Sequence, residues 1–150
     1  MKENLGVKGY FEIEVRDKEG NLKAKRISPN TVTNAGKAEI AGLILTDVTG
    51  VNDFDYLALG TGTTTPSATD TALVAELYRT AGTGTRITTS VANDTAQLSG
   101  SFSMTTTANI AEVGIFNSSS GGVLLARSTF SAIATQNGDI INAIYKTQVS

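Results

Sequence analysis

The chain has 150 residues, a formal net charge of −2, 17% charged residues, 15 glycines, and neither histidine nor cysteine. A chain of this length is typical of one domain, and we expect residues 1–150 to form a single β-rich domain. The two missing residue types exclude histidine-dependent nucleophilic catalysis, disulfides, and zinc sites built from thiolate or imidazole ligands. Catalysis would have to use carboxylates, lysine, tyrosine or threonine.

The charge balance also bears on the partners of the chain. A nucleic-acid-binding protein carries a basic stripe, which this sequence does not show. Its apolar runs, such as Leu43-Ile44-Leu45, are far shorter than the roughly 20 residues of a membrane span, and its first residues contain no apolar signal segment. We therefore expect neither nucleic acid nor membrane as a partner, and synthesis in a cytoplasm.

Charged residues are concentrated near the N-terminus. Twelve of the 26 formal charges lie in residues 2–26, and only five lie in residues 87–150. The second half of the chain instead presents serine, threonine, asparagine and glutamine. Threonine suits β-strands, so its abundance indicates extended structure and solubility before it indicates a site.

Residues 7–27 predict an N-terminal β-hairpin. Phe11, Ile13 and Val15 alternate with charged residues in residues 7–16, which is the period of a half-buried strand. The turn-forming cluster of residues 17–21 includes Gly20, and residues 22–27 return as a second strand.

One helix is expected near residues 35–45. The Ser28-Pro29-Asn30 segment interrupts the preceding strand, and Thr33 or Asn34 can cap the helix that follows. Alanines and isoleucines then recur at helical spacing. Gly36 and Gly42 oppose the helix, since each glycine costs about 1 kcal/mol relative to alanine.

The remainder is read mostly as short strands separated by turns. Residues 71–79 fit either a short helix or an extended segment, and residues 60–66 are a loop. Expected strands occupy residues 54–59, 85–91, 95–104, 110–116, 123–130 and 139–149. This spacing predicts an antiparallel β-sandwich or barrel-like sheet of about seven or eight strands. For its core we select Tyr78, Ile115, Phe116, Leu125 and Phe130.

Short motifs that suggest ligand binding are incomplete here. Gly60-Thr61-Gly62 lacks the third glycine and the helix of a dinucleotide fingerprint, and Gly82-Thr83-Gly84 lacks the lysine of a phosphate-binding loop. Asp53 and Asp55 are a fragment of a calcium-binding pattern, for which a loop or strand-start role is the better interpretation. We expect no metal and no cofactor.

Glu112 is the most unusual residue, because it lies in the middle of an apolar strand. Strict alternation places it on the face of Ile110 and Phe116, and a buried carboxylate must be paired to be tolerated. Arg79 and Arg127 are candidate partners, since both lie in apolar segments. We hypothesise a structural ion pair that fixes the sheet register. A catalytic role would need a second acid at a defined separation, and nothing nominates one.

Several segments together resemble a broad group of tailed-phage virion proteins, many of them tail-fibre or tail-associated. The segments are NTVTNAG (30–36), YLALGTG (56–62), DTAL with ELYR (70–79), AEVGIF (111–116) and LLAR (124–127). The opening hairpin also looks like the N-terminal part of such proteins, so the resemblance covers nearly the whole chain. It implies a virion structural role without enzymatic activity, and it implies that Glu112 and the arginines belong to the fold.

The chain has neither the repetitive shaft nor the receptor-binding tip of a complete fibre. We therefore expect a compact tail or neck accessory or fibre-adaptor subunit, located in the virion and acting as a homotrimer or higher ring that contacts other virion proteins. Residues 1–26, 60–67 and 117–122 are the expected contact surfaces. The alternatives are a capsid decoration protein, a host glycan- or receptor-binding module and, least favoured, a carboxylate glycosidase.

Overall fold

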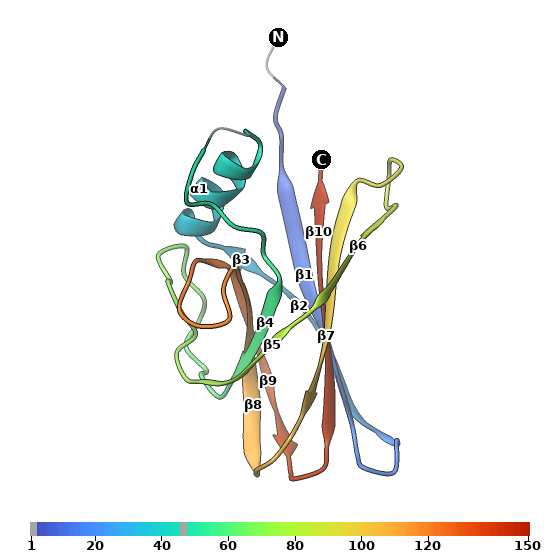
Figure 1. The fold of residues 1–150 in the computed structure, drawn as a ribbon. Coiled ribbons are helices and arrows are strands. Elements are labelled where there is room, and N and C mark those ends of the chain that lie inside the picture. Colours follow the sequence, from blue (N-terminus) through green and yellow to red (C-terminus); the bar gives the residue numbers. More distant parts are fainter. Residues whose placement is uncertain (1–2, 46–47) are drawn as a thin grey trace.

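The computed structural model describes residues 3–45 and 48–150 as two antiparallel five-stranded sheets stacked as a sandwich, with one short helix (Figure 1). The predicted mainly-β class is confirmed. The strand number was underestimated, since the described residues form ten strands, and the two sheets do not close into a barrel. The elements are β1 (Val7–Arg16), β2 (Leu22–Pro29), β3 (Thr31–Val32), α1 (Asn34–Leu43), β4 (Tyr56–Gly60), β5 (Glu76–Ala81), β6 (Thr83–Ile87), β7 (Thr95–Ser103), β8 (Ala108–Phe116), β9 (Leu124–Thr135) and β10 (Ile140–Val149).

The first sheet has the order β2-β1-β10-β7-β6, and the second has the order β3-β9-β8-β4-β5. The additional strands arise where the chain crosses between the sheets. A single residue separates β2 from β3 and β5 from β6, namely Asn30 and Gly82. Because these four strands are the edges of the two sheets, each crossing joins the sheets along one side of the sandwich. The ambiguous segment 71–79 contains no helix: residues 71–75 are irregular, and residues 76–79 belong to β5.

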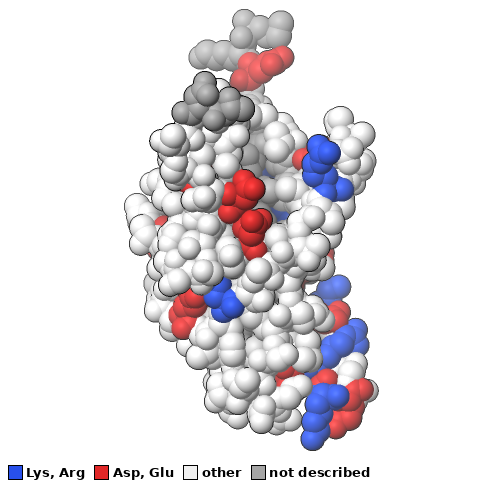
Figure 2. All heavy atoms as spheres, viewed as in Figure 1, with Lys and Arg blue, Asp and Glu red and all other residues white. Residues whose placement is uncertain are grey.

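Charged side chains are sparse over much of the face of the molecule seen in Figure 2. Lysine, arginine and acidic residues gather over the β1–β2 hairpin at the lower right of that view, where Arg16, Asp17, Lys18 and Glu19 surround the turn. Most of the remaining visible face is uncharged. The uneven distribution along the sequence is therefore also an uneven distribution in space.

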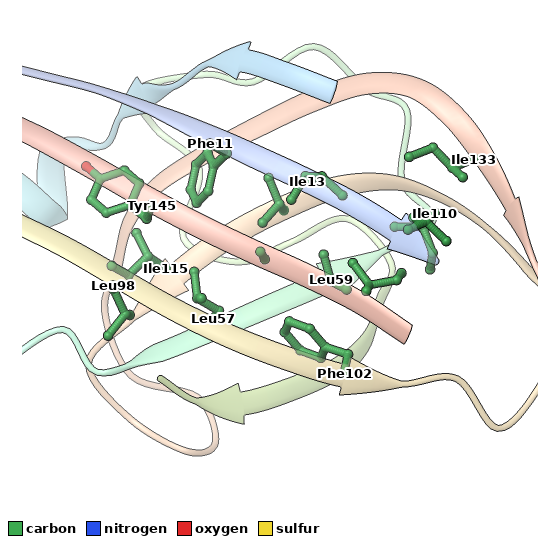
Figure 3. Close-up of a cluster of buried hydrophobic side chains, with 14 of the residues drawn as sticks. Phe11, Ile13, Leu57, Leu59, Leu98, Phe102, Ile110, Ile115, Ile133 and Tyr145 are labelled. Carbon is green, nitrogen blue, oxygen red and sulfur yellow. The ribbon is translucent and has the colours of Figure 1, made fainter. Parts of the chain in front are cut away.

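The core lies between the two sheets (Figure 3). Phe11, Ile13 and Val15 of β1 point inward, and the Phe11 ring packs 4.8 Å from the Tyr145 ring of β10. Ile115, Phe116 and Leu125 are buried as expected, whereas Tyr78 and Phe130 are only partly buried and pack against the core. Phe116 belongs to a second, smaller cluster with Ala58, Leu73 and Leu124.

Helix α1 begins one residue earlier than the expected range of 35–45, and it ends two residues earlier than that range does. Thr33 is its N-cap, and the Thr33 hydroxyl accepts a hydrogen bond from the Gly36 amide at 2.9 Å. Gly36 lies directly against β9, because a Cβ atom there would be 2.6 Å from the Leu125 carbonyl oxygen. No helix of the described residues has the length and apolarity needed to cross a membrane.

Gly36→Ala therefore lowers stability, although alanine is the better helix former. We expect a loss of about 1–3 kcal/mol in the free energy of unfolding, because backbone atoms of Leu125 must move to admit the methyl group. Urea denaturation measures the loss. In the control Gly84→Ala no atom lies within 4 Å of the new methyl group, so a change within about 0.5 kcal/mol is expected. Equal effects of the two substitutions would contradict this packing.

The turn between β6 and β7 is organised by Asp94. Its carboxylate accepts hydrogen bonds from the backbone amides of Thr89, Ser90 and Val91, and from the Gln148 side chain of β10. The hydrogen bond from the Val91 amide is the largest cause that holds the pKa of Asp94 well below its usual range. Because these hydrogen bonds favour the charged form of the carboxylate, they stabilise the folded chain when Asp94 is ionised.

The stabilisation from Asp94 should depend on pH. Because the folded-state pKa is lowered, the contribution is present above the ordinary pKa of 3.8 and is lost as the pH falls through the lower, folded-state pKa. Asp94→Asn should destabilise the protein at pH 7, and the difference from the wild type should shrink as the pH falls below 3.8. Thermal unfolding across this range measures it. A difference that does not vary with pH would contradict a role for the charge.

Candidate functional site: a buried ion network beneath a strap

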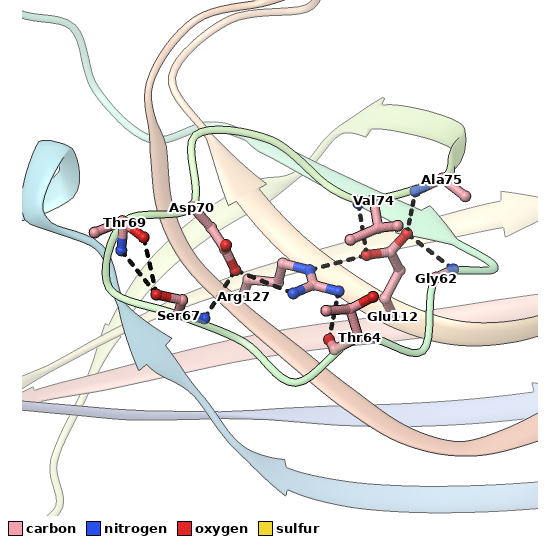
Figure 4. A network of polar contacts seen from close by, with 9 residues as sticks. All are labelled: Gly62, Thr64, Ser67, Thr69, Asp70, Val74, Ala75, Glu112 and Arg127. Carbon is pink, nitrogen blue, oxygen red and sulfur yellow. Dashed lines mark hydrogen bonds and ion pairs between the residues drawn. The ribbon is translucent and has the colours of Figure 1, made fainter.

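The segment of residues 61–75, here called the strap, connects β4 to β5 and lies across the outer face of the second sheet (Figure 4). Leu73 anchors it by packing against Phe116 and Leu124. The strap approaches closely because β8 has a glycine beneath it. A Cβ atom at Gly114 would lie 2.8 Å from the Leu73 side chain.

Glu112 of β8 points into the strap and is fully buried. One carboxylate oxygen, Oε1, accepts hydrogen bonds from the amides of Gly62 at 3.0 Å and Ala75 at 2.7 Å. The other oxygen accepts from the amide of Val74 at 3.0 Å and from Nε of Arg127 at 2.9 Å. The carboxylate therefore holds both ends of the strap, through amides that are twelve and thirteen residues apart in sequence.

Arg127 of β9 is 1% exposed and donates in three directions. Besides Nε to Glu112, Nη1 donates to the Asp70 carboxylate at 3.0 Å and Nη2 donates to the Thr64 carbonyl at 2.9 Å. Asp70 and Thr64 both belong to the strap, and Asp70 also accepts from the Ser67 amide. The guanidinium thus holds the middle of the strap, where Glu112 holds its ends.

The hydrogen bonds of the network offset the cost of burying its two charges. Removing a carboxylate and a guanidinium from water costs several kcal/mol per ion, which is tolerated only when hydrogen bonds satisfy the remaining lone pairs and protons. Both oxygens of Glu112 are doubly hydrogen-bonded, and three of the five N–H groups of Arg127 are used. A carboxylate so engaged and so buried is suited to holding backbone.

The two candidate arginines have different partners. Arg127 pairs with Glu112, whereas Arg79 forms a two-pronged ion pair with Glu76, through Nε at 2.8 Å and Nη2 at 2.6 Å. Arg79 also stacks its guanidinium 3.7 Å from the centre of the Phe116 ring and donates to the Ser118 and Gly121 carbonyls. It therefore links β5 to the turn between β8 and β9.

The expected face of Glu112 requires one correction. Ile110, Val113 and Ile115 all belong to the core between the sheets, so strict alternation fails between Ile110 and Val113. The cause is an irregularity in the β8–β9 register between Ile110 and Glu112. It turns Glu112 away from Ile110 and toward the strap.

Sequence reasoning did not identify Asp70, Thr64 or the three amides as parts of the network. The signals it did have were that Asp70 begins, and Gly62 ends, two of the segments that carry the resemblance, DTAL and YLALGTG. Asp53 and Asp55 are exposed and do not join it. Among the described residues, no group of three or more acidic side chains is arranged to hold a metal ion.

A separate groove of about 750 Å³ opens at the end of the sandwich where both termini lie (Figure 1). Its floor is the inner face of the first sheet, including Tyr145 and Thr147 of β10, and its opposite wall includes Ile40 and Leu43 of α1. The lining is mainly apolar. Burial raises the pKa of the Tyr145 hydroxyl to about 12, as expected for a phenol in such surroundings.

Comparisons with protein-family models, with curated proteins and with solved structures find no match to this chain. The candidate site is therefore described by its own geometry.

Arg127→Met should be strongly destabilising, because it leaves the Glu112 carboxylate buried without its charged partner. We expect a loss of about 3–5 kcal/mol in the free energy of unfolding. Arg79→Met is the matched control: its partner Glu76 is partly exposed, so a loss of about 1–2 kcal/mol is expected. Chemical denaturation of both variants measures the difference. An Arg127→Met loss no larger than that of Arg79→Met would contradict the network.

Proposed function

We propose that the chain is a non-enzymatic structural subunit of a tailed-phage virion, a compact tail or neck accessory or fibre adaptor that works as a symmetric homo-oligomer. The resemblance of its segments to tailed-phage virion proteins supports this proposal. Neither histidine nor cysteine is available for the commonest chemistries near neutral pH.

One observation carries the proposal. Of the segments that bear the resemblance, those in residues 56–62, 70–79, 111–116 and 124–127 come together as the second sheet and its strap. Their charged residues are used to hold main chain or one another, namely Asp70, Glu76, Arg79, Glu112 and Arg127. The residues that carry the resemblance therefore serve to build this sheet, which suits a structural protein.

The surface offers a basis for self-association. Charged residues are depleted at the centres of protein interfaces, and the second half of this chain contains few of them. Large apolar side chains are exposed near the end of the sandwich that carries the groove, and contiguous apolar patches commonly mark interaction sites. They include Leu5, Leu43, Ile44, Leu45 and Val149.

The test is the mass of the purified chain by size-exclusion chromatography with light scattering. We expect three or more copies of the 15.6 kDa chain in one species at micromolar concentration. Particles of the virus that encodes the chain should contain it in stoichiometric amounts. Labelling at the tail or neck would support an accessory or adaptor, and labelling over the capsid would support the decoration alternative. A monomer that is absent from particles would contradict the proposal.

A further inference from the structure

The groove at the end of the sandwich lies between the first sheet and an opposite wall of mixed structure. In the first sheet, β1, β10 and β7 extend toward this end, and their inward-facing residues Val7, Ala96 and Thr147 line the groove. The opposite wall is made by α1, by the segment before β4, which contributes Phe54, and by Ile115 and Leu125 of the second sheet. The groove is the space that these two walls leave between them.

The groove has the properties of a binding surface. Its volume of about 750 Å³ falls in the range of ligand-binding pockets, and its lining is mainly apolar.

The rim adds charges that lack partners. Arg86 of β6 and the acidic pair Asp53 and Asp55 all line the groove. Within the part of the chain that the structure describes, none of the three forms a salt bridge. Arg86 lies on β6, whereas Asp53 and Asp55 lie in the segment before β4, so the two signs of charge come from different walls of the groove. An occupant with an apolar side chain on the floor and an acidic one on the β6 side would match the floor and Arg86 together.

The chain itself carries such a segment at the same end. Residues 3–6, here called the N-terminal arm, precede β1, and Figure 1 shows them extending past the sheets. Leu5 is 73% exposed, and Glu3 lies two residues before it. The arm leaves the body at Gly6, whose amide bonds to the Ser150 carbonyl, next to the groove-lining residues Val7 and Val149.

We infer that the groove receives the N-terminal arm of a second copy of this chain, so that each copy in a ring passes its arm to the next. Leu5 would enter the apolar floor and Glu3 would face Arg86. A ring of three or more copies joins each copy to its neighbour through two different surfaces, and arm and groove form such a pair. The inference rests on the self-association proposed above and names the surfaces that carry it.

Disulfide trapping tests the inference cleanly, because the natural chain contains no cysteine. One chain carries Leu5→Cys and a second, with a different affinity tag, carries Ala96→Cys in the groove floor. The control partner carries Ser101→Cys, an exposed position on the opposite face of the same strand β7. Under mild oxidation, we expect at least about ten-fold more mixed disulfide with Ala96→Cys than with Ser101→Cys.

A charge exchange gives a second, independent readout. Arg86→Glu should reduce the oligomeric fraction seen by light scattering, and Glu3→Arg in the same chain should restore it. An oligomer that forms without preferential trapping at Ala96→Cys would overturn the inference and leave the proposed function standing. A chain that stays monomeric at all concentrations would overturn both.

Discussion

The contact between Glu112 and Arg127 is the constraint on which the second sheet depends. It joins adjacent strands β8 and β9 across a surface where neither charge reaches water. An ion pair in such a place brings little net stability by itself, because its attraction only offsets the loss of hydration. Its consequence is specificity: any arrangement of the strap that leaves these two charges without their amide and carbonyl partners is strongly disfavoured.

The strap in turn determines how the rest of the sheet is covered. Glu112 holds the ends of the strap and Arg127 holds its middle, so that Leu73 packs against the outer face of β8. This covers an apolar patch that would otherwise be exposed, and it leads the chain into β5 and then across to the first sheet. The buried charges thus hold in place fifteen residues of irregular chain, and these residues include few apolar side chains that could hold the segment by packing.

Much of the fold followed from sequence periodicity, and the failures have physical causes. The hairpin of β1 and β2 alternates cleanly because one of its faces is solvated. The interruptions at Asn30 and Gly82 carry proline and glycine signals, but the sequence does not show that the chain changes sheets there, because only one residue separates the two extended segments. The face of Glu112 was assigned wrongly with respect to Ile110, since a β-bulge changes the alternation without marking the sequence.

The candidate site was only partly accessible to sequence reasoning for a related reason. A carboxylate within an apolar strand indicates that a positively charged partner is needed, so the sequence could nominate Arg127 together with Arg79. The choice between them depends on strand pairing: β9 is hydrogen-bonded to β8, whereas β5 lies beyond β4. Backbone amides of a loop carry no side-chain signature, so the Glu112 contacts to Gly62, Val74 and Ala75 became visible only in three dimensions.

Hydrogen exchange at the strap tests the central claim most directly. If Glu112 holds the strap, the amides of Gly62, Val74 and Ala75 should exchange as slowly as those of β8 in the wild-type protein. They should become fast in the folded fraction of an Arg127→Met sample. Rapid exchange of these three amides in the wild type, with β8 still protected, would show that the strap opens freely and would contradict the account.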